Sequence, residues 1–122
     1  MSIERKFLCS LLLWAMLVGG AAAATEAQKI ELLIQSVEQM KNAKFVRNGV
    51  EYDANAAGEH LRMKLRAAGS NVKTANDFIR LCASKSSVSG KPYQIRFSDG
   101  RVVTSGAFLR QKLKELNSPG KK

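Results

Sequence analysis

The sequence predicts a small α+β domain, in which about four helices cover one face of a short antiparallel sheet made of hairpins. Four segments carry apolar residues at the three- and four-residue spacing of an amphipathic helix. Two further segments are strand-like on either side of a turn, at Asn48-Gly49 and at Asp99-Gly100. The order is helix, hairpin, helix, helix, hairpin, helix. Because a two-stranded hairpin is only marginally stable in water, we expect the helices to supply its cover.

Residues 1–24 predict a secretory signal peptide that precedes these elements. Arg5 and Lys6 form a basic start, an apolar run extends over 7–18, and the alanines at 21–24 offer a cleavage site. The run is shorter than the roughly 20 apolar residues needed to cross a bilayer. We therefore expect export, no stable membrane insertion after cleavage, and a single mature domain over 25–122.

The first half of that domain predicts two helices with a turn between them. The first helix is expected over 26–41, with Ile30, Leu33, Ile34, Val37 and Met40 on its buried face. Segment 45–52 alternates around Asn48-Gly49, a pair that readily takes the positive φ angles of a type I′ turn, and predicts either a short hairpin or an ordered loop. Asp53 is expected to cap the second helix, which ends at Gly69. The inward residues of that helix are Ala57, Leu61, Leu65 and Ala68.

A third, short helix follows. Thr74 and Asp77 have the spacing of a capping box, although Asp is less usual there than Glu or Gln. The apolar residues that follow are Phe78, Ile79, Leu81 and Cys82. The next segment, 84–92, carries four serines, a glycine and a proline, and this composition predicts a loop.

The last part predicts the clearer hairpin and a final helix. Residues 93–97 alternate, Asp99-Gly100 makes a turn, and 101–104 returns the chain. Ser105 is expected to cap the last helix, and 117–122 to form a frayed tail. The inward residues of this helix are Phe108, Leu109, Leu113 and Leu116.

Charge and cysteine content restrict the partners. The sequence has 20 basic and 10 acidic residues, and removing residues 1–24 leaves 18 and 9, a net charge of +9. An acidic protein or another anionic component of the envelope is therefore a possible partner, but not nucleic acid, which is normally absent there. Because the basic residues are spread over several segments, a solvated surface is favoured over a dedicated anion groove. Cys82 is the only thiol after cleavage; we expect it to be buried and the protein to be monomeric.

No residue pattern predicts catalysis, a cofactor or a metal. His60, the only histidine, could act as a general base, but a structural hydrogen bond is favoured because no nucleophile stands at a diagnostic spacing. One histidine, one thiol and scattered carboxylates do not form a zinc pattern. The loop at 84–92 is not a phosphate-binding loop, since Lys85 and Pro92 replace residues that such a loop requires. Its hydroxyls either bind a polar ligand or, as we favour, cap the third helix and the turn.

Four ordered motifs resemble the YfeK-like family of small exported proteobacterial proteins, domain of unknown function 5329. They are the segments at 45–52, 57–64, 74–79 and 83–93, which span nearly all of the mature chain. The resemblance implies a Gram-negative periplasmic location and no assigned activity. If the family shares a site, its matching polar residues here are Arg47, Asn48, Tyr52, His60, Lys64, Ser84, Ser86, Ser87, Ser89 and Tyr93.

The leading hypothesis is a non-enzymatic periplasmic binding or interaction module. Its ligand surface would join the segment from Arg47 to Tyr52, the His60 face and the serine-rich loop, where polar and turn residues concentrate. One alternative is an envelope hydrolase that uses His60 with a loop serine. Another is an inhibitor or immunity protein of a periplasmic enzyme. No catalytic residue is assigned.

Overall fold

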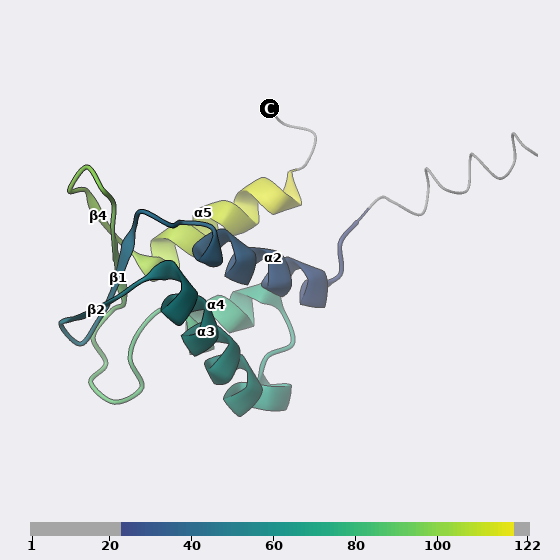
Figure 1. Ribbon diagram of the computed structural model, residues 1–122. Coiled ribbons are helices and arrows are strands. Elements are labelled where there is room, and N and C mark those ends of the chain that lie inside the picture. Colours follow the sequence, from purple (N-terminus) through teal and green to yellow (C-terminus); the bar gives the residue numbers. More distant parts are fainter. Residues whose placement is uncertain (1–22, 119–122) are drawn as a thin grey trace, which may run out of the picture.

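The computed structural model describes residues 23–118. The predicted signal peptide lies outside the described residues except for positions 23 and 24, and so does most of the predicted frayed tail. The elements in chain order are α2 (Glu26–Glu38), β1 (Lys44–Arg47), β2 (Val50–Tyr52), α3 (Ala54–Ala68), the 3₁₀ turn η1 (Gly69–Asn71), α4 (Ala75–Cys82), β3 (Gln94–Arg96), β4 (Val102–Thr104) and α5 (Ser105–Asn117). Figure 1 shows their arrangement. None of the described helices has the length and apolar character needed to span a membrane.

The two predicted hairpins join into one antiparallel sheet of four strands in the order β2-β1-β3-β4. The pairing of β1 with β3 places Phe45 opposite Ile95, and Ile95 in turn stands opposite Val103 on β4. Asn48 and Gly49 have φ angles of 53° and 80°, as a type I′ turn requires. Segment 45–52 is therefore a hairpin and not an ordered loop.

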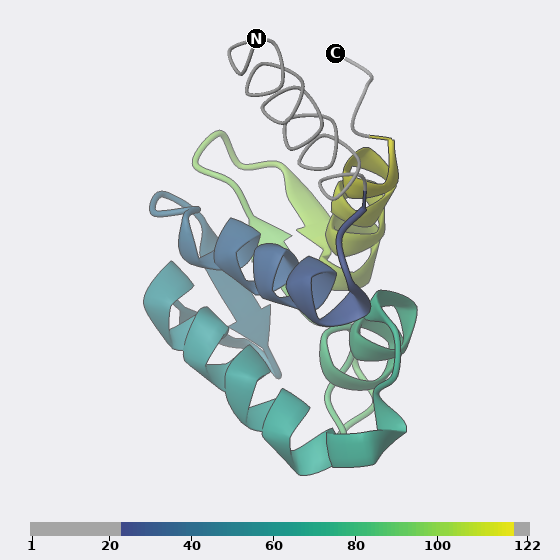
Figure 2. The same ribbon diagram turned by 90° about the vertical axis from the view of Figure 1, so that its right-hand side faces the viewer.

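The helices pack on one side of this sheet, as Figures 1 and 2 show from two directions. Between the two layers lies one core cluster that includes residues of every helix and of the central strands. Its largest fully buried side chains are Phe78, Leu33, Ile34, Ile79, Ile95, Leu109, Val37 and Cys82. The predicted α+β fold class and the predicted burial of Cys82 are confirmed.

Side-chain caps fix where the helices begin. Asp53 accepts a hydrogen bond from the backbone N–H of Ala56 at 2.8 Å, as expected for the cap of α3. Thr74 and Asp77 form the predicted capping box of α4, with both of its hydrogen bonds present. Because these bonds satisfy N–H groups that have no partner within a helix, they determine the first helical residue.

Two element boundaries differ from the prediction. The first helix ends at Glu38, and Met40 lies in a turn closed by the bond from its N–H to the Val37 carbonyl; it still packs against the core. The last helix also begins differently: Thr104 and not Ser105 caps α5. The Ser105 N–H donates instead to the Tyr93 carbonyl, and this bond to the sheet buries Ser105 as the first residue of the helix.

One residue of the predicted tail belongs to the last helix instead: Asn117 is the last residue of α5. On α4, Phe78, Ile79 and Cys82 are buried, whereas Leu81 is 39% exposed.

Candidate functional site

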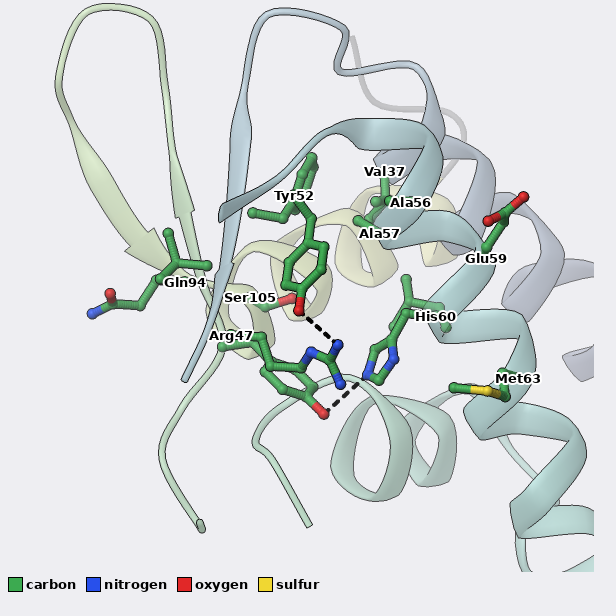
Figure 3. A pocket seen from close by; sticks show the side chains of 14 residues that line it. Val37, Arg47, Tyr52, Ala56, Ala57, Glu59, His60, Met63, Gln94 and Ser105 are labelled. Carbon is green, nitrogen blue, oxygen red and sulfur yellow. Dashed lines mark hydrogen bonds between the residues drawn. The ribbon is translucent and has the colours of Figure 1, made fainter. Parts of the chain in front are cut away.

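A pocket of about 260 Å³ lies between α3 and the strands β1 and β2 (Figure 3). Its apolar wall is formed by Val37, Phe45, Ala57 and Leu61, with Met63 also lining the pocket. Four of its polar residues come from three separate segments: Arg47 and Tyr52 from the first hairpin, His60 from α3, and Tyr93 from the position before β3. Ligand pockets combine an apolar lining with a few convergent polar groups in this way.

Strand alternation brings the two hairpin residues into the pocket. Phe45 faces the core and Arg47 follows two positions later on the same face, while Tyr52 stands opposite Phe45 on β2. The Arg47 guanidinium donates a hydrogen bond to the Tyr52 hydroxyl at 2.9 Å. Its central carbon also lies 4.9 Å from the centre of the Tyr52 ring. The two contacts hold the guanidinium at the pocket wall.

Beside Arg47, His60 and Tyr93 form a second pair. His60 Nε2 and the Tyr93 hydroxyl are 3.2 Å apart and hydrogen-bonded, and the two rings meet edge to face with centroids 5.6 Å apart. Figure 3 marks this bond and the Arg47–Tyr52 bond with dashed lines. Burial lowers the pKa of His60, and the positive charges of Arg47 and Lys64 lower it further. The imidazole is therefore neutral at neutral pH.

Three other predicted site residues bind the serine-rich loop to the first hairpin. Ser86 is buried, and its hydroxyl oxygen accepts hydrogen bonds from the Asn48 side-chain amide at 3.2 Å and from the N–H groups of Val88 and Ser89. The Ser89 hydroxyl donates to the Asn48 side-chain oxygen. These polar atoms already have partners within the protein, so their evident role is to shape the loop.

The remaining three residues attach the loop to the helices. The Ser84 hydroxyl donates to the Ile79 carbonyl at 2.6 Å near the end of α4, and the same carbonyl accepts from the Ala83 N–H. Lys64 on α3 donates to the Ser87 hydroxyl at 2.5 Å. Of the ten predicted residues, four therefore line the pocket and six hold the loop in place beside it. Ser84 and Ser86 make the capping contacts that were expected of the serines.

Sequence reasoning missed several residues of the pocket wall. Ser105 lines the pocket, although its spacing indicated a helix cap. The structure records no hydrogen bond for its hydroxyl within residues 23–118. Met63 is 52% exposed one turn after His60, and an exposed methionine on a polar helix face was the available signal. Gln94 lines the pocket from β3 and carries no comparable signal in the sequence.

Comparison with known proteins supplies the family. Residues 24–117 match the family described as "Family of unknown function (DUF5329)". The chain belongs to the DUF5329 family. It is also similar to "Uncharacterized protein YfeK" of Salmonella typhimurium, with 35% identity over 91 residues that cover 73% of this chain and 76% of that protein. No solved structure matches.

The resemblance to the YfeK-like proteins is thus confirmed. The side chains of the site indicate which chemistry this DUF5329 protein can perform. Within the described part of the chain, no group of three or more His, Cys, Asp or Glu side chains is placed to hold a metal. The recorded partner of the His60 ring is Tyr93, whereas the hydroxyls of Ser84, Ser86, Ser87 and Ser89 bond elsewhere. The arrangement is suited to binding by hydrogen bonds, charge and apolar contact.

Proposed function

We propose that this protein is a non-enzymatic binding module of the bacterial periplasm, exported through its N-terminal signal peptide, that takes a small ligand into the pocket between α3 and the sheet. The observation that carries the proposal is the convergence of three segments on one apolar pocket. Arg47, His60 and Tyr93 contribute donors and acceptors to it from β1, α3 and the start of β3. A packing defect would not require polar groups from three elements.

The size of the pocket restricts the ligand. Its volume of about 260 Å³ lies just below the roughly 300–1,000 Å³ of typical ligand pockets. The apolar wall of Phe45, Ala57 and Leu61 favours a ligand with an apolar body. The polar residues Arg47, His60 and Tyr93 favour a ligand with one hydrogen-bonding end. The proposed ligand is therefore a small amphipathic molecule and not a polymer.

Methionine methyl NMR tests this proposal directly. Met63 lines the pocket, whereas Met40 packs against the core outside it and serves as the internal reference. Titration with hexanamide, a short neutral amphipathic probe, is expected to shift the Met63 methyl signal and leave the Met40 signal in place.

A matched pair of variants locates the binding. Ala56 lines the pocket and Ala67 is an exposed residue of the same helix outside it. Ala56→Leu should fill the pocket and abolish the Met63 shift, while Ala67→Leu should bind as wild type. The amide NMR spectrum of each variant verifies the fold. If Ala56→Leu is folded and still binds hexanamide with unchanged affinity, the pocket is not the binding site.

A further inference from the structure

Within the described residues, the charge of Arg47 lacks an acidic partner. No ion pair formed within residues 23–118 involves this residue. Its recorded side-chain hydrogen bond is to the neutral Tyr52 hydroxyl. A guanidinium carries five N–H groups, so one bond to Tyr52 leaves further donors for a ligand. Its charge also reaches His60, since it lowers the pKa of that residue.

The acidic side chains of the pocket lining and of the neighbouring strand do not pair with this charge. Glu59 lines the pocket, but Figure 3 shows its carboxylate pointing away from Arg47 and His60. Glu51, on the strand paired with β1, forms its ion pair with Arg96. With His60 neutral at neutral pH, the pocket therefore carries the positive charge of Arg47 beside an apolar wall.

We propose that the ligand is a monocarboxylate with a short apolar body, its carboxylate on Arg47 and its body against Phe45, Ala57 and Leu61. This inference rests on the proposed function and names the ligand class. The planar fork of one guanidinium matches the two oxygens of one carboxylate. A phosphate would leave oxygens unsatisfied beside a single cation and an apolar wall. The carboxylate belongs either to a free acid or to the C-terminal residue of a peptide.

Matched acid and amide probes test the charge preference. Hexanoate and hexanamide share an apolar body and differ in charge, as do N-acetylleucine and its amide. Because a charge-assisted hydrogen bond is markedly stronger than a neutral one, we expect the protein to bind at least one acid about tenfold more tightly than its amide. A preference confined to hexanoate indicates a free acid, and one confined to N-acetylleucine indicates a peptide end.

Arginine variants show whether Arg47 causes the preference. Arg47→Gln should remove the preference for the acid, so that the variant binds hexanoate and hexanamide with affinities equal within about twofold. Arg47→Lys keeps the positive charge but loses the planar guanidinium fork, so it should retain part of the preference for the acid. The control is Arg101→Gln, which loses the same charge; Arg101 also lies over an aromatic ring, Phe97, but is not among the pocket residues. This control should bind both probes as wild type.

Failure of this inference is distinguishable from failure of the proposed function. Equal affinity of wild type for each acid and its amide overturns the carboxylate assignment and leaves a pocket that binds neutral molecules. An acid preference that survives in folded Arg47→Gln also overturns it, because Arg47 is then not the anion site. If no probe shifts the Met63 signal, both proposals are wrong.

Discussion

His60 is the pocket residue whose protonation state changes as the pH falls below neutral. It is surrounded by Arg47 of β1, Lys64 of its own helix and Tyr93 before β3. Burial, followed by the two cations, lowers its pKa below the ordinary value of about 6.5. The unfolded chain, where the pKa returns to that value, therefore binds the proton more readily than the folded protein. Stability from neutral His60 is complete above pH ~6.5 and is lost as the pH falls through the folded pKa.

We predict that His60→Gln reduces this acid sensitivity. Between about pH 7 and pH 5, the urea midpoint of wild type should fall more steeply than that of the variant, because only wild type must bury an imidazolium. Carboxylates titrate in both proteins, so their contributions to the pH dependence cancel when the two proteins are compared. Since the sequence contains one histidine, its ring signals in NMR give the folded pKa without ambiguity. The prediction is contradicted if the urea midpoints of the two proteins fall equally with pH, or if the pKa of His60 in the folded protein lies above about 6.5.

Cys82 shows what burial does to a reactive group. Its side chain is fully buried, and burial raises the pKa of the thiol. We expect Cys82 to react slowly with a thiol reagent in the native protein and rapidly after denaturation, as measured by mass spectrometry of the labelled peptide. Cys82→Ser should cost about 1–3 kcal/mol of unfolding free energy, because it buries a hydroxyl. Cys82→Ala should cost less. Fast native labelling would show that this face of α4 opens to solvent.

At the scale of elements, the contact between α2 and α3 depends on a missing side chain. Gly58 on α3 faces Glu38 at the end of α2, and a Cβ at position 58 would lie 2.4 Å from Glu38 Cγ. Glu38 in turn accepts hydrogen bonds from Arg62 at 3.1 Å, and Arg62 also binds Glu31 at 2.9 Å. The glycine therefore allows the close approach that lets one arginine bridge two carboxylates of the neighbouring helix.

Gly58→Ala tests this packing. In an ordinary helix interior the change stabilises a protein by about 0.5–1 kcal/mol. Here we expect a loss of about 1 kcal/mol or more, because Glu38 must move and its bonds to Arg62 break. Thermal unfolding measures the loss. In a Glu38→Ala background the same substitution should be neutral or stabilising, and destabilisation in both backgrounds would refute the role given to Glu38.

The elements were largely predictable, because their signals are local. Asp53, Thr74 and Asn48-Gly49 each fix a boundary through atoms within a few residues. The pairing of β1 with β3 has no such signal, because the two strands belong to hairpins that are distant in the sequence.

The candidate site was predictable only in part, for the same reason. The sequence indicated which segments are polar, but the pairing of β1 with β3 brings Arg47 and Tyr93 to one pocket. Ser86 shows what local signals leave out. The serine-rich loop favoured a capping role for its hydroxyl, but the sequence carries no signal for the hydrogen bond that this hydroxyl accepts from the distant Asn48.

At the scale of the whole molecule, a single core connects every layer. Ile95 is fully buried between Phe45 of the first hairpin and Val103 of the second, and it belongs to the same cluster as Leu33, Phe78 and other helix residues. The pocket lies where the first hairpin, α3 and the start of β3 meet, so it exists only when sheet and helices are assembled. We therefore expect the described domain to unfold as one cooperative unit.

Ile95→Ala is the sharpest test of that cooperativity. The lost methyl groups and the cavity they leave should cost about 2–5 kcal/mol. Far-UV circular dichroism follows the helices, and tyrosine fluorescence follows the pocket, because both tyrosines of the sequence, Tyr52 and Tyr93, line it. In urea the two signals should share one midpoint in wild type. In the variant they should share one midpoint again, at a lower urea concentration. The edge-strand control Val102→Ala, at a residue that is 50% exposed, should shift the midpoint little. Loss of the fluorescence signal at lower urea than the helical signal would show that the hairpins detach first, and the pocket would then be a property of the sheet's docking rather than of the whole fold.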